Sequence, residues 1–354
     1  MKVAQIAPLY ESVPPKFYGG TERVVSYLTD GLVCQGHDVT LYASADSVTM
    51  AELRPMCEKA LRLQGSKVVD PLAGHIRMLE IVAQEASEFD VVHFHIDYLH
   101  FPITRRQSVP SLTTLHGRLD IPEIHALFRE FPEMNLVSIS DAQREPMKWA
   151  NWVGTVHHGL PEDLYPPSYN AGKYLAFIGR ISPEKRVDRA IEVAKQVGLP
   201  LKIAAKVDAA DKDYFEAEIQ GLLDHPLVEY IGEIGEHEKA EFLGNAMALI
   251  FLIDWQEPFG LVLTEAMACG TPVIAYNRGS VAEIIDEGLT GFIVEDETSA
   301  VSAVGRLSQL SRDTVRKQFE RRFTARRMAL DYLAAYRGLM DAAAPRIKLV
   351  SSAE

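Results

Sequence analysis

Short runs rich in β-branched residues alternate with longer helical patterns along the 354-residue sequence. In the first half we expect strands at 3–7, 38–43, 90–94, 111–115, 136–139 and 155–157. The clearest helical pattern covers 20–35, where Val24, Val25, Leu28 and Leu32 recur on one face and Gly36 follows as a stop signal. This alternation is typical of parallel sheets built from strand–helix–strand units, so we expect an α/β fold with doubly wound, Rossmann-like sheets.

The same rhythm restarts in the second half of the chain. We expect strands at 174–178, 201–205, 228–231, 248–252, 272–275 and 292–294, and helices at 183–196, 211–223, 237–245, 260–269 and 281–286. Between the halves, the prolines and polar residues of 161–172 indicate a linker. A chain of this length suits two domains of about 150 residues each. We therefore expect one domain at 1–160 and a second at 173–320.

Composition narrows the class of protein. Apolar residues make up 47% of the chain and charged residues 24%, an ordinary globular balance. The net charge of −13 argues against nucleic acid as a partner, because proteins that bind it show a basic footprint. The three cysteines are too few and too scattered for a disulfide framework or a zinc site. The opening segment has too short an apolar run for a signal peptide, and no run approaches the ~20 apolar residues of a membrane span, so we expect a cytoplasmic protein.

Two glutamates eight positions apart mark the strongest candidate site. Glu257 lies just before a Pro-Phe-Gly turn, and Glu265 lies about one turn inside the helix that follows. A helix start offers free backbone N–H groups and a partial positive charge, which suit a phosphate. The neighbours of Glu265 are nearly all apolar, where a carboxylate is costly to bury without partners. Carboxylates on both sides of an anion site could bind the hydroxyl groups that flank the diphosphate of a nucleotide sugar. The alternative is a pair of surface glutamates on an amphipathic helix.

Cationic residues elsewhere fit the same kind of ligand. Arg180 follows a predicted strand, and Lys185 lies near a predicted helix start, where Ser182 and Pro183 read as an N-cap pair. A planar guanidinium and a compact ammonium group could converge on one diphosphate. Ordinary solvated charges are the alternative reading.

Glycines and a histidine follow strands of the first half. Gly19 and Gly20 open a predicted helix and allow close backbone approach to a ligand, although a plain turn would need them too. His116 ends a predicted strand, and ligands of open α/β sheets bind beyond the carboxyl ends of strands. The chain has neither Gly-x-Gly-x-x-Gly nor Gly-Lys-Thr/Ser, which disfavours a nicotinamide enzyme or an ATPase.

Two further groups of residues have more than one reading. A strand of the first half carries alternating side chains with the spacing of metal ligands, namely His93, His95 and Asp97. We interpret His93 as a core residue. We place His95 and Asp97 on the side of an acceptor substrate. From about residue 311 the chain is helical and partly basic. Its cations read as a solvated helix face or, alternatively, as a contact with an acidic membrane surface; they are Arg312, Arg316, Lys317, Arg321, Arg322, Arg326 and Arg327.

Together these segments resemble family 4 of the retaining glycosyltransferases, which have the GT-B fold. The resemblance covers nearly the whole chain. It rests on four segments in matching order and spacing, which are Tyr18-Gly19-Gly20-Thr21-Glu22-Arg23, Thr114-Leu115-His116-Gly117, Gly179-Arg180-Ile181-Ser182-Pro183-Glu184-Lys185 and Glu257 to Ala275. It implies two Rossmann-like domains that face a central cleft, with the acceptor on the first domain and the nucleotide sugar on the second. It also implies that a C-terminal helix, here 321–354, returns to the first domain.

The resemblance implies a role for each candidate residue. Glu257 contacts the transferred sugar, Glu265 holds the ribose, and Arg180 and Lys185 bind the diphosphate. The expected catalytic residues are Glu257, His116, Arg180 and Lys185. The expected donor-binding residues are Gly19, Gly20, Arg180, Lys185, Phe259, Gly260, Leu261, Val262 and Glu265, and the expected acceptor-side residues are His95 and Asp97.

The expected reaction is transfer of a hexose from a nucleotide diphosphate sugar to an acceptor hydroxyl, with retention and without cofactor or metal. A UDP-sugar is the expected donor, with GDP- and ADP-sugars as alternatives. The acceptor is a carbohydrate, a lipid or a small molecule, and peripheral membrane contact is open. A nucleotide-sugar epimerase, a sugar phosphorylase and a non-catalytic nucleotide-sugar binder remain as alternatives.

Overall fold

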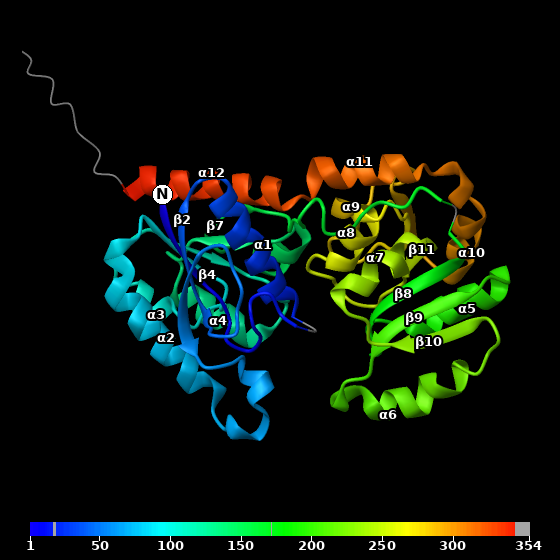
Figure 1. Cartoon of the computed structure of the whole chain (residues 1–354), viewed down its shortest axis with the longest axis horizontal. Helices are drawn as coiled ribbons and strands as arrows, with labels where there is room; N and C mark the ends of the chain where they lie inside the picture. Colours follow the sequence, from blue (N-terminus) through cyan, green and yellow to red (C-terminus); the bar gives the residue numbers. More distant parts are fainter. Residues whose placement is uncertain (17–18, 171, 344–354) are drawn as a thin grey trace, which may run out of the picture.

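The structure is a computed structural model that describes residues 1–16, 19–170 and 172–343. Its strands form two sheets, one in each of two lobes that lie side by side (Figure 1). Both sheets are parallel, and helices cover them. These two parallel sheets confirm the expected α/β fold. The fold was predictable because strands that are buried on both faces appear in the sequence as continuous apolar runs.

The first lobe holds a seven-stranded sheet with the order β3-β2-β1-β4-β5-β6-β7. Its strands are β1 (Lys2–Ile6), β2 (Asp38–Ser44), β3 (Glu52–Cys57), β4 (Val91–Phe94), β5 (Ser111–Thr114), β6 (Leu136–Ser138) and β7 (Trp152–Thr155). Its helices are α1 (Gly20–Cys34), α2 (Pro71–Glu85), α3 (Phe101–Thr104) and α4 (Pro122–Glu130). Strand order reverses between β1 and β4, which places the loops after these strands at the edge where ligands bind in such sheets.

The second lobe repeats this plan with six strands in the order β10-β9-β8-β11-β12-β13. Its strands are β8 (Tyr174–Arg180), β9 (Leu201–Lys206), β10 (Val228–Gly232), β11 (Ala246–Phe251), β12 (Val273–Tyr276) and β13 (Gly291–Val294). Its helices are α5 (Val187–Val197), α6 (Lys212–Tyr214), α7 (Glu236–Gly244), α8 (Leu261–Ala268), α9 (Val281–Ile284) and α10 (Glu297–Gly305). Here the order reverses between β8, which ends at Arg180, and β11, which is followed by the loop that carries Glu257.

Several expected elements are placed differently. The strand expected at 155–157 lies earlier, at β7, and β3 has no counterpart among the expected strands because its exposed residues lack an apolar run. Helix α5 begins at Val187 instead of 183, after a turn that ends with Arg186 in the left-handed region at φ 51°. The helix expected at 211–223 is broken into short pieces, including one π-helical turn at Phe215–Ile219.

Two helices end the described chain and run along both lobes, as Figure 1 shows in orange and red. Helix α11 (Arg312–Arg322) packs on α8 of the second lobe, and α12 (Ala325–Ala343) packs on α1 of the first. Between them, Leu160 forms a bridge with Thr324, so the two passages of the chain from lobe to lobe are paired. Of the expected C-terminal segment, 344–354 lies outside the described residues. Within the described helices, none combines the length and apolar character needed to cross a bilayer.

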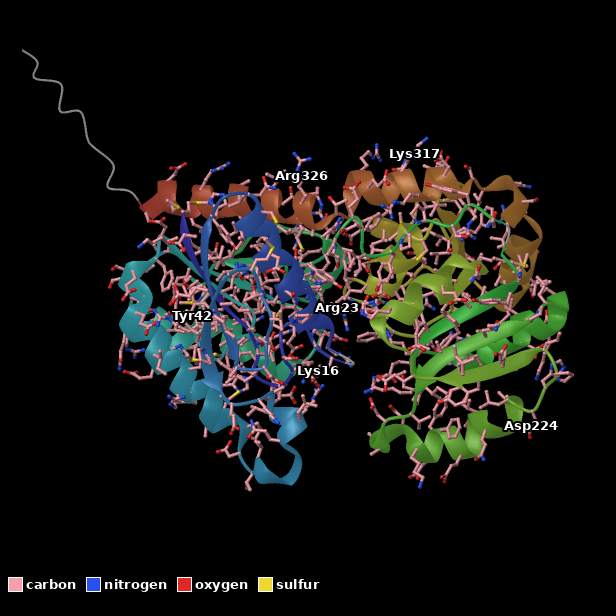
Figure 2. The ribbon with its side chains drawn as sticks, in the orientation of Figure 1. Lys16, Arg23, Tyr42, Asp224, Lys317 and Arg326 are labelled. Atoms are coloured by element: carbon pink, nitrogen blue, oxygen red, sulfur yellow. The ribbon has the colours of Figure 1, made fainter. Side chains whose placement is uncertain are left out.

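Four basic residues of this region form hydrogen bonds within the protein. For these four, the sequence predictions of a solvated helix face and of a membrane contact are both wrong. Arg312 donates to the carbonyl oxygens of Ser168, Gly244 and Ala246. Arg316 is 6% exposed and donates to backbone oxygens at Glu162, Tyr165 and Ala268. Arg322 bonds Asp286, and Arg327 donates to the carbonyl oxygens of His157 and His158. Other cations of these helices, such as Lys317 and Arg326, point outward (Figure 2).

Candidate active site

A cleft of about 790 Å³ separates the lobes, and residues of both lobes line it. The loops after β1, β4 and β5 contribute from the first lobe, and those after β8, β10 and β11 from the second. Both sheets therefore present their ligand-binding edges to one cavity. All of the expected site residues lie along it, namely Gly19, Gly20, His95, Asp97, His116, Arg180, Lys185, Glu257, Phe259, Gly260, Leu261, Val262 and Glu265.

Glu257 is fixed by two donors from its own lobe. Its Oε2 lies 2.6 Å from Nζ of Lys185 and 3.1 Å from Nε1 of Trp255. The same ammonium group lies 4.9 Å from the centre of the Trp255 ring, within range of a cation–π contact. Gly260 has φ 79° and is followed by the first turn of α8. The free backbone N–H groups of that first turn therefore lie in the cleft, beside this ion pair.

Glu265 lies one turn into α8 and is 3% exposed. Its burial is compensated by Lys239 of α7, whose Nζ lies 2.8 Å from Oε1 of Glu265. Lys239 also lies 3.6 Å from Glu236, which forms an ion pair with Arg23 of α1. A chain of alternating charges thus crosses the cleft, and Figure 2 shows Arg23 on the side of the first lobe that faces the second.

Arg180 extends from the end of β8 into a group of carboxylates. Its guanidinium lies 3.2 Å from Glu184, 3.5 Å from Asp208 and 3.4 Å from Asp211. The expected N-cap at Ser182 is wrong, because 182–186 forms a turn and the buried hydroxyl of Ser182 caps no helix. This turn nevertheless brings Lys185 to the same cleft as Arg180.

Gly19 and Gly20 place the start of α1 against the second lobe. A Cβ at Gly19 would lie 2.8 Å from the Cβ of Pro15, so the loop closes only around glycine. A Cβ at Gly20 would lie 3.7 Å from Leu261 of α8, across the cleft. Tyr18 of the same motif lies outside the described residues.

Four histidines pack together where the first lobe meets the cleft. Nε2 of His116 lies 2.9 Å from Nδ1 of His95, and the His116 ring stacks on His158 with centroids 5.3 Å apart. Burial lowers the pKa of His116 to about 3, so its ring is neutral. His93 is fully buried, as expected of a core residue, and its ring lies 4.1 Å from that of His95.

Asp97 follows these strands in the left-handed region, at φ 52°. Its side chain reaches the cleft, and burial raises its carboxyl pKa to about 6. Over the described ranges, no three His, Cys, Asp or Glu side chains are grouped in a way that could hold a metal ion.

Several residues of this site were missed by sequence reasoning. Lys239, the partner of Glu265, lies 26 positions away from it, and no local pattern links the two. Trp255 and His158 are likewise joined to the site only by folding. Gln5 could have been noticed, because it is a polar residue between apolar residues of β1.

Comparisons with known proteins identify glycosyltransferases as relatives of this chain. The family model described as "Glycosyltransferase Family 4" matches residues 18–191, and the one described as "Glycosyl transferases group 1" matches 166–326. The glycogen synthase of Mycobacterium tuberculosis is 25% identical, over 96% of this chain and 97% of that protein. The phosphatidyl-myo-inositol mannosyltransferase of Mycobacterium leprae is 24% identical, over 90% of each. The solved structure of Anabaena HepE in complex with UDP and glucose has a TM-score of 0.71 and 16% identity, over 96% of this chain and 100% of that one.

Proposed function

Since the chain is a glycosyltransferase with the GT-B fold, we propose that it transfers a hexose from a nucleotide diphosphate sugar to an acceptor hydroxyl. The observation that carries this proposal is the set of residues that line one cleft. Arg180, Lys185, Glu257 and Glu265 line it together with the N-terminus of α8. Cations and a helix start suit a diphosphate, while carboxylates suit the hydroxyl groups on either side of it.

In this proposal the second lobe binds the donor. The diphosphate lies between the start of α8 and the pair Arg180 and Lys185. Glu265 accepts hydrogen bonds from the ribose, and Glu257 from hydroxyls of the transferred hexose. Residues 173–320 are then the donor domain, and 1–160, with the helix that returns to it, the acceptor domain; 161–172 links them.

The transfer proceeds with retention, on the face from which the diphosphate leaves. The leaving diphosphate accepts the proton of the attacking hydroxyl, while Arg180 and Lys185 stabilise its charge. The carboxylate of Glu257 is held by Lys185 and Trp255. It therefore serves to position the sugar, in contrast to a free nucleophile of the kind that retaining hydrolases use. No metal is required, because the two side-chain cations offset the diphosphate.

Relatives support the substrate class. HepE was solved with UDP and glucose, and two relatives are named as a glycogen synthase and a mannosyltransferase. We propose a UDP-hexose as the donor, with GDP- and ADP-hexoses as alternatives. The acceptor is a carbohydrate, a lipid or a small molecule. If membrane contact occurs, the exposed cations Lys317, Arg321 and Arg326 are the groups that remain for it.

Release of nucleoside diphosphate from a panel of nucleotide hexoses tests the proposal. With EDTA present, one nucleotide hexose should release its nucleoside diphosphate faster when an acceptor sugar or lipid is added. NMR of the product should show that the donor's anomeric configuration is kept. An epimerase would convert the donor without acceptor, and a phosphorylase would require inorganic phosphate. Inversion, or activity lost in EDTA and restored by magnesium, would contradict the mechanism.

A further inference from the structure

A chain of buried hydrogen bonds joins His116 in the cleft to α12. His95 lies behind His116, and its second ring nitrogen, Nε2, lies 2.7 Å from Oε1 of Gln5 on β1. Gln5 in turn donates from Nε2 to the hydroxyl of Tyr336 on α12, at 3.0 Å. Gln5 and Tyr336 are fully buried and His95 is 3% exposed. Water therefore does not compete for these groups, and each hydrogen bond constrains the next.

A second branch leaves the same tyrosine. The hydroxyl of Tyr336 lies 2.7 Å from Nδ1 of His93, and Nε2 of His93 lies 2.8 Å from Oγ1 of Thr114. Thr114 also bonds the hydroxyl of Tyr332, one turn earlier on α12, at 2.8 Å. Tyr336 therefore contacts the branch that leads to His116, whereas Tyr332 ends the other branch.

The amide of Gln5 sets the direction of proton donation. Its Oε1 can only accept, so Nε2 of His95 is the protonated nitrogen. Burial lowers the pKa of His95 well below its usual value, so the ring is neutral and Nδ1 carries a lone pair. That lone pair requires an N–H at Nε2 of His116. The neutral ring of His116 is then left with a lone pair at Nδ1.

Nδ1 of His116 is buried and has no hydrogen-bond partner within the described residues. His116 nevertheless lines the cleft, so a bound substrate can reach it. A buried polar atom without a partner is costly, and a ligand that supplies the missing partner is favoured.

We infer that Gln5, His95 and Tyr336 are positioning residues, which hold His116 as its Nε2–H tautomer and present the Nδ1 lone pair to a sugar hydroxyl. The inference rests on the proposed function, in which the hexose lies beside His116. A lone pair selects a donor, so this position binds a hydroxyl and rejects a phosphate or carboxylate oxygen. Helix α12, which returns to the first lobe, thereby sets the protonation pattern of a group in the cleft.

Nitrogen NMR of the full chain with ¹⁵N-labelled histidine tests this assignment without any substrate. In the wild type, the His116 signals should show a proton on Nε2 and none on Nδ1. Tyr336→Phe removes the acceptor that orients the Gln5 amide, so both tautomers of His116 should become populated. Tyr332→Phe is the matched control, since it removes a buried hydroxyl from the same helix and should leave the His116 tautomer unchanged.

Kinetics provides the second readout. With the active nucleotide hexose, Tyr336→Phe should lower kcat about tenfold, which corresponds to ~1.4 kcal/mol, with little change in donor KM. Tyr332→Phe should keep the wild-type kcat. A proton on Nδ1 of wild-type His116, or equal effects of the two variants on its tautomer, would overturn the inference. If the tautomers behave as expected but no nucleotide sugar turns over, the assignment stands and the proposed function fails.

Discussion

The two glutamates of the cleft differ in their surroundings, and this difference predicts different kinetic roles. Glu265 is buried against Lys239, whereas Glu257 is held near the helix start by Lys185. Ribose contacts are similar in the ground and transition states, while contacts to the sugar strengthen as charge develops. We expect Glu265→Gln to weaken donor binding about tenfold to a hundredfold, as for a lost charged hydrogen bond. Glu257→Gln should mainly lower kcat.

Calorimetric titration with the donor and steady-state kinetics measure these effects. Glutamine keeps the shape of each side chain, so folding should survive, and thermal unfolding checks this. Glu241→Gln on α7 is the control, because that carboxylate is exposed and lies outside the cleft lining. Equal losses of donor affinity in both cleft variants, with kcat intact, would contradict the assigned roles.

Arg180 and Arg186 form a natural comparison for diphosphate binding. Both side chains are 29% exposed and both are paired with carboxylates, but only Arg180 lines the cleft. Arg180→Ala should weaken binding of UDP, or of whichever nucleoside diphosphate binds, about tenfold or more, since charged hydrogen bonds are worth ~1.5–3 kcal/mol each. Arg186→Ala should bind the nucleotide normally. Fluorescence or calorimetric titration measures both, and near-normal affinity in Arg180→Ala would remove Arg180 from the site.

Sequence reasoning at the residue scale located the groups of the cleft but could not reveal their partners. Each of five predicted residues belongs to a segment whose residue types favour ligand binding; they are Glu257, Glu265, Arg180, Lys185 and His116. Whether each of them contacts the donor stays a prediction. Their partners come from distant parts of the chain, because folding alone determines which side chains meet.

At the scale of elements, the central strands were predictable and the irregular ones were not. Buried parallel strands such as β1 and β11 have apolar runs on both faces, which few other structures require. Strand β3 is largely exposed and has no such run. The start of α5 was also misplaced, because a proline near a turn resembles a proline in the first turn of a helix.

The basic C-terminal helices show a different limit. A sequence pattern cannot distinguish an arginine in solvent from one that donates to backbone carbonyls of another element. Arg312 and Arg316 do the latter, so they attach α11 to the linker and to the end of α8. The sequence does not show these hydrogen bonds because they depend on the tertiary fold: the carbonyl acceptors lie up to 154 positions away from the two arginines.

The paired passages between the lobes should be sensitive to a single methyl group. A Cβ at Gly159 would lie 2.2 Å from the carbonyl oxygen of Thr324, beside the Leu160–Thr324 bridge. Gly159→Ala should therefore destabilise the protein by about 1–3 kcal/mol, as overpacking of a tight site does. Gly154→Ala on β7 is the control, since its Cβ would meet nothing within 4 Å. Urea unfolding measures both, and equal midpoints would show that the passage tolerates a side chain.

At the scale of the whole molecule, the ion pair between Arg23 and Glu236 joins the two lobes beside the proposed donor site. Both side chains are mostly buried, at 11% and 16% exposed, so salt screens the pair only in part. Burial raises the carboxyl pKa of Glu236, and Lys239 and Arg23 counteract this. Because Lys239 also contacts Glu265, the pair couples the separation of the lobes to the carboxylate proposed to hold the ribose.

Arg23→Gln should therefore favour an open arrangement of the lobes. We expect a larger radius of gyration by small-angle X-ray scattering and a donor KM raised several-fold, because a smaller fraction of the protein is ready to bind. Glu236→Gln should have a similar effect, and Arg23→Gln should add little in that background, since a double-mutant cycle isolates the pair. Arg118→Gln, whose partner Asp120 lies in the same lobe, controls for the loss of a cation. Additive effects of Arg23→Gln and Glu236→Gln would mean that this contact does not hold the lobes together, and closure would then have to depend on the donor alone.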